Sequence, residues 1–274
     1  EGDMVELAQP LFVNKHHPEV PFCSPGKGTV TAINRGPRRA LHSVVIRLDG
    51  NARSEQRYEP IEQDRLARLK HEEVAGRLRE TGQWTAFRSR PFSRVPGAEE
   101  IPRSLFVTAM DTRPLAADPK VVVREDEEHF ANGLRVLPVL TNGPVFVCTA
   151  PGWDIALPES DRIRHVTFSG PHPAGLAGTH IHHLDPAGVG RHVWHIGSQD
   201  VIAIGKLFAE GRLDTGRVVA IGGSCGQNPR LVKARIGASI DELTESCMAE
   251  CQGFRVLSGS VLGGRTAADG LAYL

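Results

Sequence analysis

Six histidines lie close together in the stretch SGPHPAGLAGTHIHHLDPAGVGRHVWH. An extended backbone through THIHH would send the side chains of His180 and His182 to the same side, as two metal ligands from one strand require. No H-E-x-x-H motif occurs and Asp185 is the only carboxylate close by in sequence, so the pattern assigns no metal. A structural or interface role is favoured, with His180 and His182 hydrogen-bonded and the glycines allowing close backbone packing. A third metal ligand would have to come from His172, His183 or His195.

Glycine-rich motifs that bind the phosphates of nucleotides are missing from the sequence. The sequence has no G-x-G-x-x-G after a strand and no G-x-x-x-x-G-K-[ST]. The nearest stretch, IGGSCGQNP, lacks the spacing that lets a helix N-terminus receive pyrophosphate, although such a loop can still bind an anion through backbone N–H groups. The sequence therefore predicts no nucleotide site of the usual kinds.

The loop TGQWTAFRSRPFSR combines aromatic and arginine side chains in a chain with only 5% aromatic residues. Flat apolar surface beside guanidinium groups suits a planar ring with carbonyl oxygens, such as a quinone. It equally suits a protein interface, and a loop pinned onto a sheet by its aromatic residues is the third alternative. The candidate residues are Trp84, Phe87, Arg88, Arg90 and Phe92, with Arg94 beside them.

Composition limits the possible partners. Lys+Arg and Asp+Glu both number 32 among the 274 residues, so no net charge draws the chain to nucleic acid or anionic lipid. No apolar run approaches the roughly 20 residues that span a bilayer, and no signal-peptide pattern opens the chain. We therefore expect a cytoplasmic chain that reaches a membrane only through a partner.

The five cysteines do not form a disulfide pattern, because their number is odd and most are scattered. Reduced thiols are expected. Cys247 and Cys251 would share one face of a helix, but a metal site would need two more ligands from elsewhere.

Three successive units are predicted to position these residues. Residues 1–50 alternate short apolar runs with the turns SPGKG and NRGPRR, which predicts a small antiparallel β unit. Residues 51–100 form a helical connection, with an exposed helix from Pro60 to Gly82 that carries apolar residues on one face, followed by the aromatic-basic loop. The chain starts abruptly, and we expect it to be a piece of a longer protein. The apolar residues of that helix are Leu66, Leu69, Val74 and Leu78.

Residues 101–274 alternate predicted strands and helices, which indicates an α/β domain with a largely parallel sheet. Strands are expected at residues 105–110, 145–148, 164–168, 193–196, 218–221 and 254–257. Helices are expected at residues 127–140, from Ser198, and near Asp241.

Several long segments resemble one known family. The stretches GPHPAGLAGTHIHHLDP, WHIGSQDVIAIGKLFAEGRL, SLFVTAMDTRPLAADP, WTAFRSRPFSRVP, NRGPRRALHSVVI and LSGSVLGGRTA are together similar to the A subunits of the sodium-translocating NADH:quinone oxidoreductases (Na+-NQR) of bacterial respiratory membranes. The resemblance covers nearly the whole chain, and the family's chains extend beyond both of its ends.

The resemblance implies a subunit on the cytoplasmic face of the bacterial inner membrane, within a six-subunit complex. That complex passes electrons from NADH through flavins and iron–sulfur centres of partner subunits to ubiquinone, and exports sodium. The A subunits are expected to bind no cofactor of their own and to act at the quinone end or in assembly. The implied fold is a Rossmann-like domain preceded by a barrel-sandwich β unit similar to lipoyl and biotinyl carriers.

The resemblance also extends to the NADH- and flavin-binding subunits of complex I and the Rnf complex. There a loop of the type GRGGAGFPT binds flavin, and the matching place here is TGQWTAFRSRPFS. Trp84, Phe87 and Arg88 carry bulk where those relatives have glycine, so we expect a filled nucleotide pocket. Lys15 does not sit in a carrier motif, so no covalent modification is expected.

Two other functions stay open from the sequence. The first is a flavin- or NADH-binding oxidoreductase domain like those relatives. The second is a metal-dependent enzyme that uses the histidine cluster.

Overall fold

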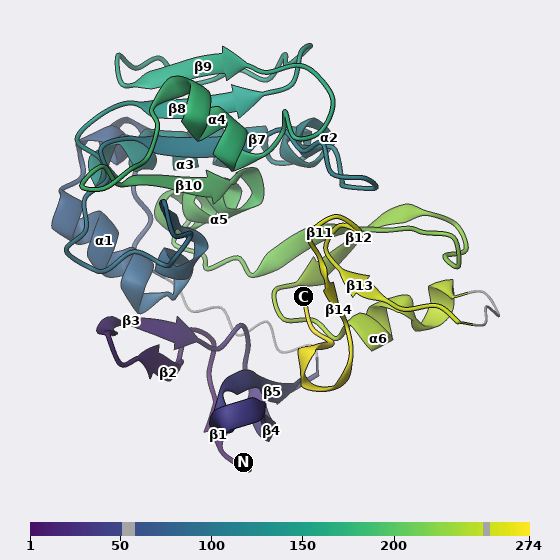
Figure 1. Ribbon diagram of the computed structural model, residues 1–274. Coiled ribbons are helices and arrows are strands. Elements are labelled where there is room, and N and C mark those ends of the chain that lie inside the picture. Colours follow the sequence, from purple (N-terminus) through teal and green to yellow (C-terminus); the bar gives the residue numbers. More distant parts are fainter. Residues whose placement is uncertain (51–57, 249–252) are drawn as a thin grey trace.

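A computed structural model describes residues 1–50, 58–248 and 253–274. Figure 1 shows three regions in chain order: small β sheets at the N-terminus, a sheet flanked by helices, and a C-terminal part of short β pairs beside the sheet. Residues 51–57 of the predicted connection, and Cys251, lie outside the described residues.

The N-terminal region is the antiparallel β unit that the turn pattern predicts. A three-stranded sheet has the order β1-β4-β5, and β2 pairs with β3. A Cβ at Gly28 would overlap the backbone of Arg47, so this glycine allows β4 and β5 to approach closely. The strands are β1 (Met4–Val5), β2 (Pro10–Asn14), β3 (His17–Cys23), β4 (Gly28–Arg35) and β5 (Leu41–Leu48).

The central region is a five-stranded sheet in the order β6-β10-β7-β8-β9. Strands β7 to β10 are parallel, and β6 is antiparallel at one edge, which confirms the largely parallel sheet. Residues of β7 and β8 are buried on both faces, as their unbroken apolar sequences predict. The strands are β6 (Arg88–Arg90), β7 (Leu105–Ala109), β8 (Val145–Thr149), β9 (Ile163–Thr167) and β10 (Val193–Gly197).

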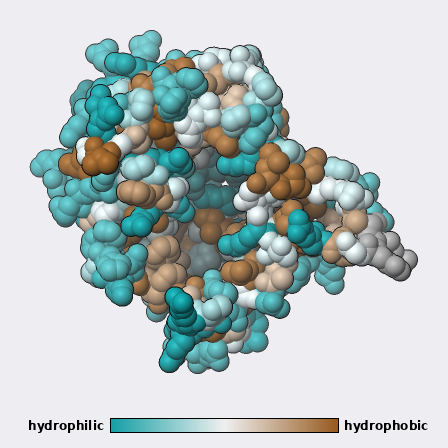
Figure 2. All heavy atoms as spheres, in the orientation of Figure 1, coloured by the Kyte–Doolittle hydropathy of each residue, from teal (hydrophilic) through white to brown (hydrophobic). Residues whose placement is uncertain are grey.

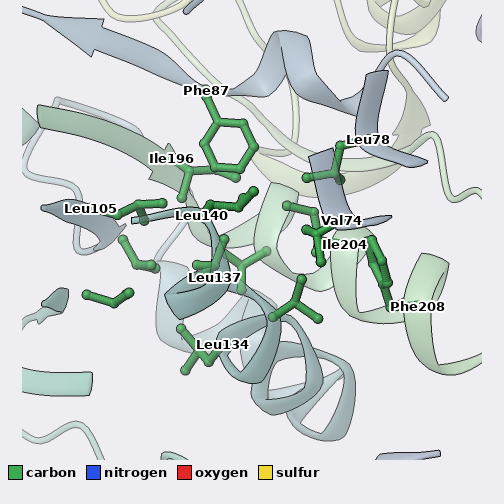
Figure 3. Close-up of a cluster of buried hydrophobic side chains, with 14 of the residues drawn as sticks. Val74, Leu78, Phe87, Leu105, Leu134, Leu137, Leu140, Ile196, Ile204 and Phe208 are labelled. Atoms are coloured by element: carbon green, nitrogen blue, oxygen red, sulfur yellow. The ribbon is translucent and has the colours of Figure 1, made fainter. Parts of the chain in front are cut away.

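Helices cover both faces of this sheet. The larger core packs α1, α3 and α5 on one face, and Figure 3 shows Val74 and Leu78 of α1 with Ile204 and Phe208 of α5 in the same buried cluster as Leu105. A smaller cluster lies on the other face under α4. The helices are α1 (His71–Glu80), α2 (Pro119–Arg124), α3 (Glu127–Val136), α4 (Ala177–Leu184) and α5 (Ser198–Ala209), with 3₁₀ turns at Gln63–Arg68, Gln83–Ala86 and Leu137–Leu140.

The predicted exposed helix from Pro60 to Gly82 is wrong in two respects. It is divided into the 3₁₀ turn Gln63–Arg68 and α1, and Gly82 ends the segment with a φ of 75°. Its apolar face is also largely buried, because Leu66, Val74 and Leu78 belong to the main core and Leu69 is partly buried against it. The connection is therefore a structural layer of the α/β region.

Helices α3 and α5 touch backbone to backbone. A Cβ at Gly205 would overlap the carbonyl oxygen of His129, and a Cβ at Gly133 would overlap that of Val201. Two glycines at one crossing thus set the distance between the helices that carry much of the core.

Gly205→Ala is expected to lower the free energy of unfolding by about 2 to 3 kcal/mol, because the added methyl group must push α3 and α5 apart. Gly76→Ala is the matched control, since a Cβ at Gly76 in α1 meets nothing within 4 Å. That change should stabilise the chain by up to about 1 kcal/mol through helix propensity. Urea titration of both variants measures the difference, and equal effects would contradict the close crossing.

The C-terminal region departs from the predicted alternation. The strand expected at residues 218–221 forms, but it pairs with β12 in a hairpin, and β13 pairs with β14. Among the described residues, none after 215 contributes a strand to the five-stranded sheet. A short apolar run predicts a strand but not the strand with which it pairs. Here the partner is β12, the next strand in the sequence. The elements are β11 (Gly216–Ile221), β12 (Arg230–Arg235), α6 (Ile240–Thr244), β13 (Leu257–Ser258) and β14 (Arg265–Thr266).

The four described cysteines are free thiols. Burial raises the pKa of Cys23 to about 11 and that of Cys148 to about 12. Both thiols therefore stay protonated at neutral pH and behave as small apolar side chains.

Candidate ligand-binding site

A cavity of about 750 Å³ lies at the carboxyl ends of β7 and β10, where the sheet meets the C-terminal region. Thr108 and Met110 border it from β7 and the loop that follows, and Gly197 borders it from the end of β10. Figure 2 shows the surface hollowed between the α/β region and the C-terminal region. The volume is within the range of about 300 to 1,000 Å³ that small-molecule sites occupy.

The strand order reverses at this edge of the sheet. From β7 the chain moves outward to β8 and β9, and then returns to form β10 on the other side of β7. Ligands of open α/β sheets bind outside the carboxyl ends of the strands, near such a reversal of strand order. The cavity is therefore placed where this type of sheet binds its ligands.

Two polar atoms at the cavity are enclosed without a partner. Nε2 of His195 and Oγ1 of Thr108 make no hydrogen bond within the described part of the chain. Buried polar atoms in proteins are nearly always paired. A ligand group that reaches these two atoms would therefore gain hydrogen bonds that the protein does not use itself.

The His195 imidazole is neutral at pH 7. Burial, followed by the positive charges of Arg90, Arg88 and Arg113, lowers the pKa of His195 to about 4. A neutral imidazole donates from one ring nitrogen and accepts at the other. His195 can therefore hydrogen-bond a ligand oxygen without adding positive charge.

Two arginines at the cavity are paired with carboxylates. Arg217, on β11, forms an ion pair with Asp200 in the first turn of α5. Arg113 Nη1 lies 3.0 Å from Asp111 Oδ2 in the loop after β7. Burial raises the pKa of Asp200, and the charges of Arg217 and Arg88 oppose that effect. The acidic side chains of the cavity lining are thus both engaged.

Two further arginines stand behind His195 without a carboxylate partner. Arg88 donates to the carbonyl oxygens of Thr85 and Phe87, the latter at 2.9 Å. Within the described ranges, neither Arg88 nor Arg90 has an ion-pair partner within 4 Å. Burial lowers the pKa of Arg88, with the charge of Asp200 opposing it. Both arginines lie next to His195 on the neighbouring strand, outside the lining of the cavity.

The rest of the wall is largely apolar. The loop after β7, the start of α2, α6 and the segment before β13 supply aliphatic side chains. The cavity is therefore lined by both apolar and polar side chains. The apolar lining residues include Met110, Leu115, Val122, Ile240, Leu243, Val256 and Leu257.

Hydrogen bonds and an ion pair connect the C-terminal region to α5 beside the cavity. Gln199 donates from Nε2 to the carbonyl oxygen of Val218 at 2.9 Å, and its Oε1 accepts from the Val218 N–H at 2.8 Å. Together with the Asp200–Arg217 ion pair, these two hydrogen bonds hold β11 against the first turn of α5.

The IGGSCG loop predicted as an anion site borders the same cavity. It contains the spacing Gly222-x-Ser224-x-Gly226, which in α/β-hydrolases places a nucleophilic serine on a turn from strand to helix. Here the loop connects β11 to β12, so Ser224 is not on such a turn. The spacing therefore does not indicate a hydrolase in this fold.

The aromatic-basic loop is divided between core and surface. Trp84 and Phe87 are fully buried and pack edge to face against each other, and Trp84 also packs against Trp194 at 5.3 Å between ring centroids. Trp84 Nε1 donates to the carbonyl oxygen of Pro96 at 2.9 Å. This burial corrects the prediction that both rings form a binding or docking surface: they pin the loop to the sheet.

The other members of the loop remain accessible in different places. Phe92 is 74% exposed, with the guanidinium of Arg94 lying 5.5 Å from its ring centroid. Arg88 and Arg90 lie on β6 opposite His195 and Val193 of β10. These two arginines therefore lie beside β10, and neither is among the residues that line the cavity.

The histidine segment is helical, which corrects the extended backbone assumed for THIHH. His180 and His182 lie on α4, where a two-residue step sends side chains to different faces. His180 is buried with Nε2 2.9 Å from the carbonyl oxygen of Ala174, whereas His182 is exposed and makes no hydrogen bond to the described residues. A Cβ at Gly175 would lie 2.6 Å from the Thr112 nitrogen, so this glycine does allow close backbone packing.

The described ranges contain neither a cluster of metal ligands nor a membrane-spanning helix. These ranges contain no group of three or more His, Cys, Asp or Glu residues that could hold a metal ion. In the same part of the chain, no helix combines the length and apolar character needed to cross a bilayer.

His195, Asp200 and Arg217 are the site residues that sequence reasoning did not select as a group. A usable signal was present, because His195 lies near the end of the predicted strand 193–196 and Asp200 lies in the first turn of the helix predicted from Ser198. Residues at that junction lie at the carboxyl edge of a parallel sheet. Arg217 could not be placed, since it comes from a hairpin outside the sheet.

The fold and site together define an α/β protein with a ligand-sized cavity at a reversal of strand order, preceded by an antiparallel β unit. Three family models match in succession: the NqrA N-terminal barrel-sandwich hybrid domain at residues 1–49, the NqrA second alpha/beta domain at residues 69–213, and the NQRA C-terminal domain at residues 218–269. The chain therefore belongs to the NqrA family, the A subunits of the Na(+)-translocating NADH-quinone reductases.

Relatives agree with this assignment over the whole chain. The A subunit of the Na(+)-translocating NADH-quinone reductase of Pseudomonas aeruginosa is 51% identical over 273 residues, which cover all of this chain and 60% of the relative. The corresponding proteins of Actinobacillus pleuropneumoniae and Neisseria meningitidis are 50% and 48% identical, each with 61% of its length covered. The chain thus spans about 60% of the length of these relatives.

One likeness to a solved structure is much weaker. An NAD+-reducing NiFe-hydrogenase in the H2-reduced state matches 70% of this chain and 41% of its own, with 11% identity and a TM-score of 0.45. This likeness carries no argument about function.

Proposed function

We propose that this chain is part of a protein that acts at the quinone end of a respiratory sodium pump, or in its assembly. The pump transfers electrons from NADH to ubiquinone and exports Na+. In this proposal the chain lies on the cytoplasmic face of the bacterial inner membrane and contacts membrane subunits. It carries no redox cofactor, and the flavins and iron–sulfur centres belong to its partners.

The observation that supports a quinone role is the ligand-sized cavity, which both apolar side chains and His195 line. A quinone ring gains from flat apolar contact, which the wall around Met110, Val122 and Leu257 offers. Its carbonyl oxygens gain from hydrogen-bond donors, and the neutral His195 borders the cavity with Arg88 and Arg90 on the adjacent strand β6. We therefore assign the quinone headgroup to this cavity in preference to the aromatic-basic loop.

The Rossmann-like part of the proposal rests on the strand order, in which the reversal lies between β7 and β10. The alternative, a flavin- or NADH-binding domain, has less support. The first loop after β7 reads AMDTRPLAADP and contains no glycine, so its backbone has no residue that lets a pyrophosphate approach closely. The likeness of the N-terminal unit to lipoyl carriers is a matter of fold only, since Lys15 is not in a carrier motif.

The test is a double variant, Arg88→Gln with Arg90→Gln, in the full-length protein within the assembled complex. Quinone reduction is expected to fall at least about tenfold in kcat/KM, because charge-assisted hydrogen bonds contribute about 1.5 to 3 kcal/mol each. NADH oxidation by an artificial acceptor should stay near the unmodified rate, since that path ends before the quinone. Enzyme assays with both acceptors measure the two rates.

The control is Arg68→Gln with Glu72→Gln, two exposed residues away from the cavity. It should leave both rates unchanged. Full quinone reduction by an assembled Arg88/Arg90 variant would exclude the cavity as the quinone site. The purified chain should also be colourless, and a stoichiometric flavin absorbance that survives gel filtration would favour the alternative.

A further inference from the structure

The apolar lining of the cavity continues from its interior onto the molecular surface. Met110, Val122 and Ile240 line it from buried positions, whereas Leu115 and Val261 line it with 63% and 66% of their surface exposed. Figure 2 shows apolar side chains beside the hollow. Exposed apolar surface of this kind marks a binding surface, and here it extends the wall of a cavity. Leu115 and Val261 are called the apolar rim below.

Leu115 is held at the rim by a turn that is unfavourable for leucine. The Ala116 N–H donates to the Arg113 carbonyl oxygen at 3.2 Å, so Pro114 is the second and Leu115 the third residue of the turn. The φ of Leu115 is 63°, as the third residue of a type II turn requires, and glycine or asparagine normally supplies it. A left-handed leucine is strained, and such residues cluster at ligand-binding sites.

The rim combines two parts of the chain that are distant in sequence. Leu115 lies in the loop after β7, and a Cβ at Gly222 would lie only 3.7 Å from its Cδ1. The leucine side chain therefore reaches the loop after β11, which also lines the cavity. Val261 lies at the tip of the hairpin that β13 and β14 form. The α/β region and the C-terminal region thus each place one apolar side chain at the rim.

We infer that the apolar rim binds the hydrocarbon chain of an amphiphilic ligand whose head lies in the cavity. The chain is of isoprenoid or alkyl type and leaves the cavity past Leu115 and Val261. The inference rests on the proposed function only in taking a quinone ring as the head.

The volume of the cavity favours a ligand with a chain over a cover of protein. A single substituted benzoquinone ring is smaller than the drug-sized ligands that fill sites of about 750 Å³. A protein that covered only the rim would leave the space beneath it unfilled. A head with a chain fills the interior and covers the rim, and burial of its apolar surface stabilises the complex.

The experiment varies the length of the chain on one ring. Isothermal titration calorimetry of the purified full-length protein uses 2,3-dimethoxy-5-methyl-1,4-benzoquinone without a chain, and the same ring with one and with two isoprene units. 1-Octanol serves as a chain without a ring. We expect two isoprene units to tighten binding at least about tenfold, which the burial of only about two methylene groups would produce.

The variants remove the apolar rim and leave the fold intact. Leu115→Asn places a polar residue that the left-handed conformation accepts, and Val261→Ser changes an exposed hairpin tip. Together they should reduce the gain from two isoprene units to less than about threefold and leave the affinity for the ring without a chain unchanged. Leu262→Ser is the matched control, because Leu262 is 61% exposed at the same tip and is not among the residues that line the cavity.

The outcomes separate the inference from the proposed function. If the ring alone binds and isoprene units add nothing, or if the gain survives in the double variant, the inference is overturned and the quinone proposal stands. If 1-octanol binds and the double variant weakens its binding, while no quinone binds, the inference is supported and the quinone proposal is overturned. If Leu262→Ser reduces the gain as much as the double variant does, general surface hydrophobicity causes it and the inference is overturned.

Discussion

Trp84→Ala is expected to lower the free energy of unfolding by about 3 to 5 kcal/mol, as large-to-small changes of fully buried aromatic residues do. Trp84 has no exposed surface and lies edge to face with both Phe87 and Trp194. Its removal leaves a cavity where the loop after α1 meets β10, and leaves the Pro96 carbonyl oxygen without its donor. Urea-induced unfolding followed by circular dichroism measures the loss.

Phe92→Ala provides the comparison within the same loop. Phe92 is 74% exposed, so its loss should change the free energy of unfolding by less than about 0.5 kcal/mol. Equal effects of the two changes would mean that the loop is not anchored as described. A strong effect of Phe92→Ala on assembly of the complex, without an effect on stability, would identify Phe92 as an interface residue.

Lys206→Met is expected to cost about 3 kcal/mol, the lower end of the range for breaking a buried ion pair. The Lys206 ammonium lies 2.8 Å from Asp214 and 3.0 Å from Asp126, and the lysine side chain is only 11% exposed. Its loss leaves two carboxylates without their common partner. Chemical denaturation at pH 7 measures the effect, and adding Asp126→Asn and Asp214→Asn should restore part of the loss.

Lys233→Met is the matched control. Lys233 pairs with Glu125 at 2.7 Å, but its side chain is 78% exposed and screened by solvent, so its loss should hardly change the free energy of unfolding. A cost as large as that of Lys206→Met would show that burial does not decide the contribution of these pairs.

The same cluster predicts how stability depends on pH. Burial acts to lower the pKa of Lys206, but hydrogen bonds and charges of Asp214 and Asp126 outweigh it and raise the pKa. Burial acts to raise the pKa of Asp214, but Lys206 and the Gly216 N–H outweigh it and lower the pKa. The contribution of the Lys206–Asp214 pair to the free energy of unfolding is therefore complete between about pH 4 and 10, which are the ordinary pKa values of an aspartate and a lysine.

Each group accounts for one limit of this range. The contribution of Lys206 is lost as the pH rises through its raised pKa, and that of Asp214 is lost as the pH falls through its lowered pKa. Unfolding free energies measured from about pH 3 to 11 should decline at both ends. In Lys206→Met both declines should become shallower, and an unchanged profile would contradict the assignment.

The sheet could be predicted from local sequence because its strands are short apolar runs between turn residues. Residues 105–110, 145–148 and 193–196 were placed correctly for that reason. The helix at α4 could not be read from the same signals. Ala177, Ile181 and Leu184 do recur at helical spacing, but the Pro-rich approach and Gly178 argue for a turn.

Whether Trp84 and Phe87 are buried or exposed depends on residues outside their loop. Aromatic residues beside arginines are typical of interfaces, cavities and cores alike, so composition does not separate these alternatives. The deciding residue is Trp194, more than a hundred positions later in the chain. The cavity is unpredictable for the same reason, since the strand order brings β7 beside β10, and β11 reaches them only through its contacts with Gln199 and Asp200.

The order of strands in the central sheet has a consequence for biosynthesis. Strand β10 is the neighbour of both β6 and β7, yet it is the last strand of the sheet to leave the ribosome. Until then β6 has no place in the sheet, and Trp84 and Phe87 lack the ring of Trp194. Pairing across such long sequence separations is slow, and apolar surface exposed meanwhile promotes aggregation. We therefore expect nascent chains that stop before β10 to depend on chaperones, and chains that extend beyond α5 to be released from them.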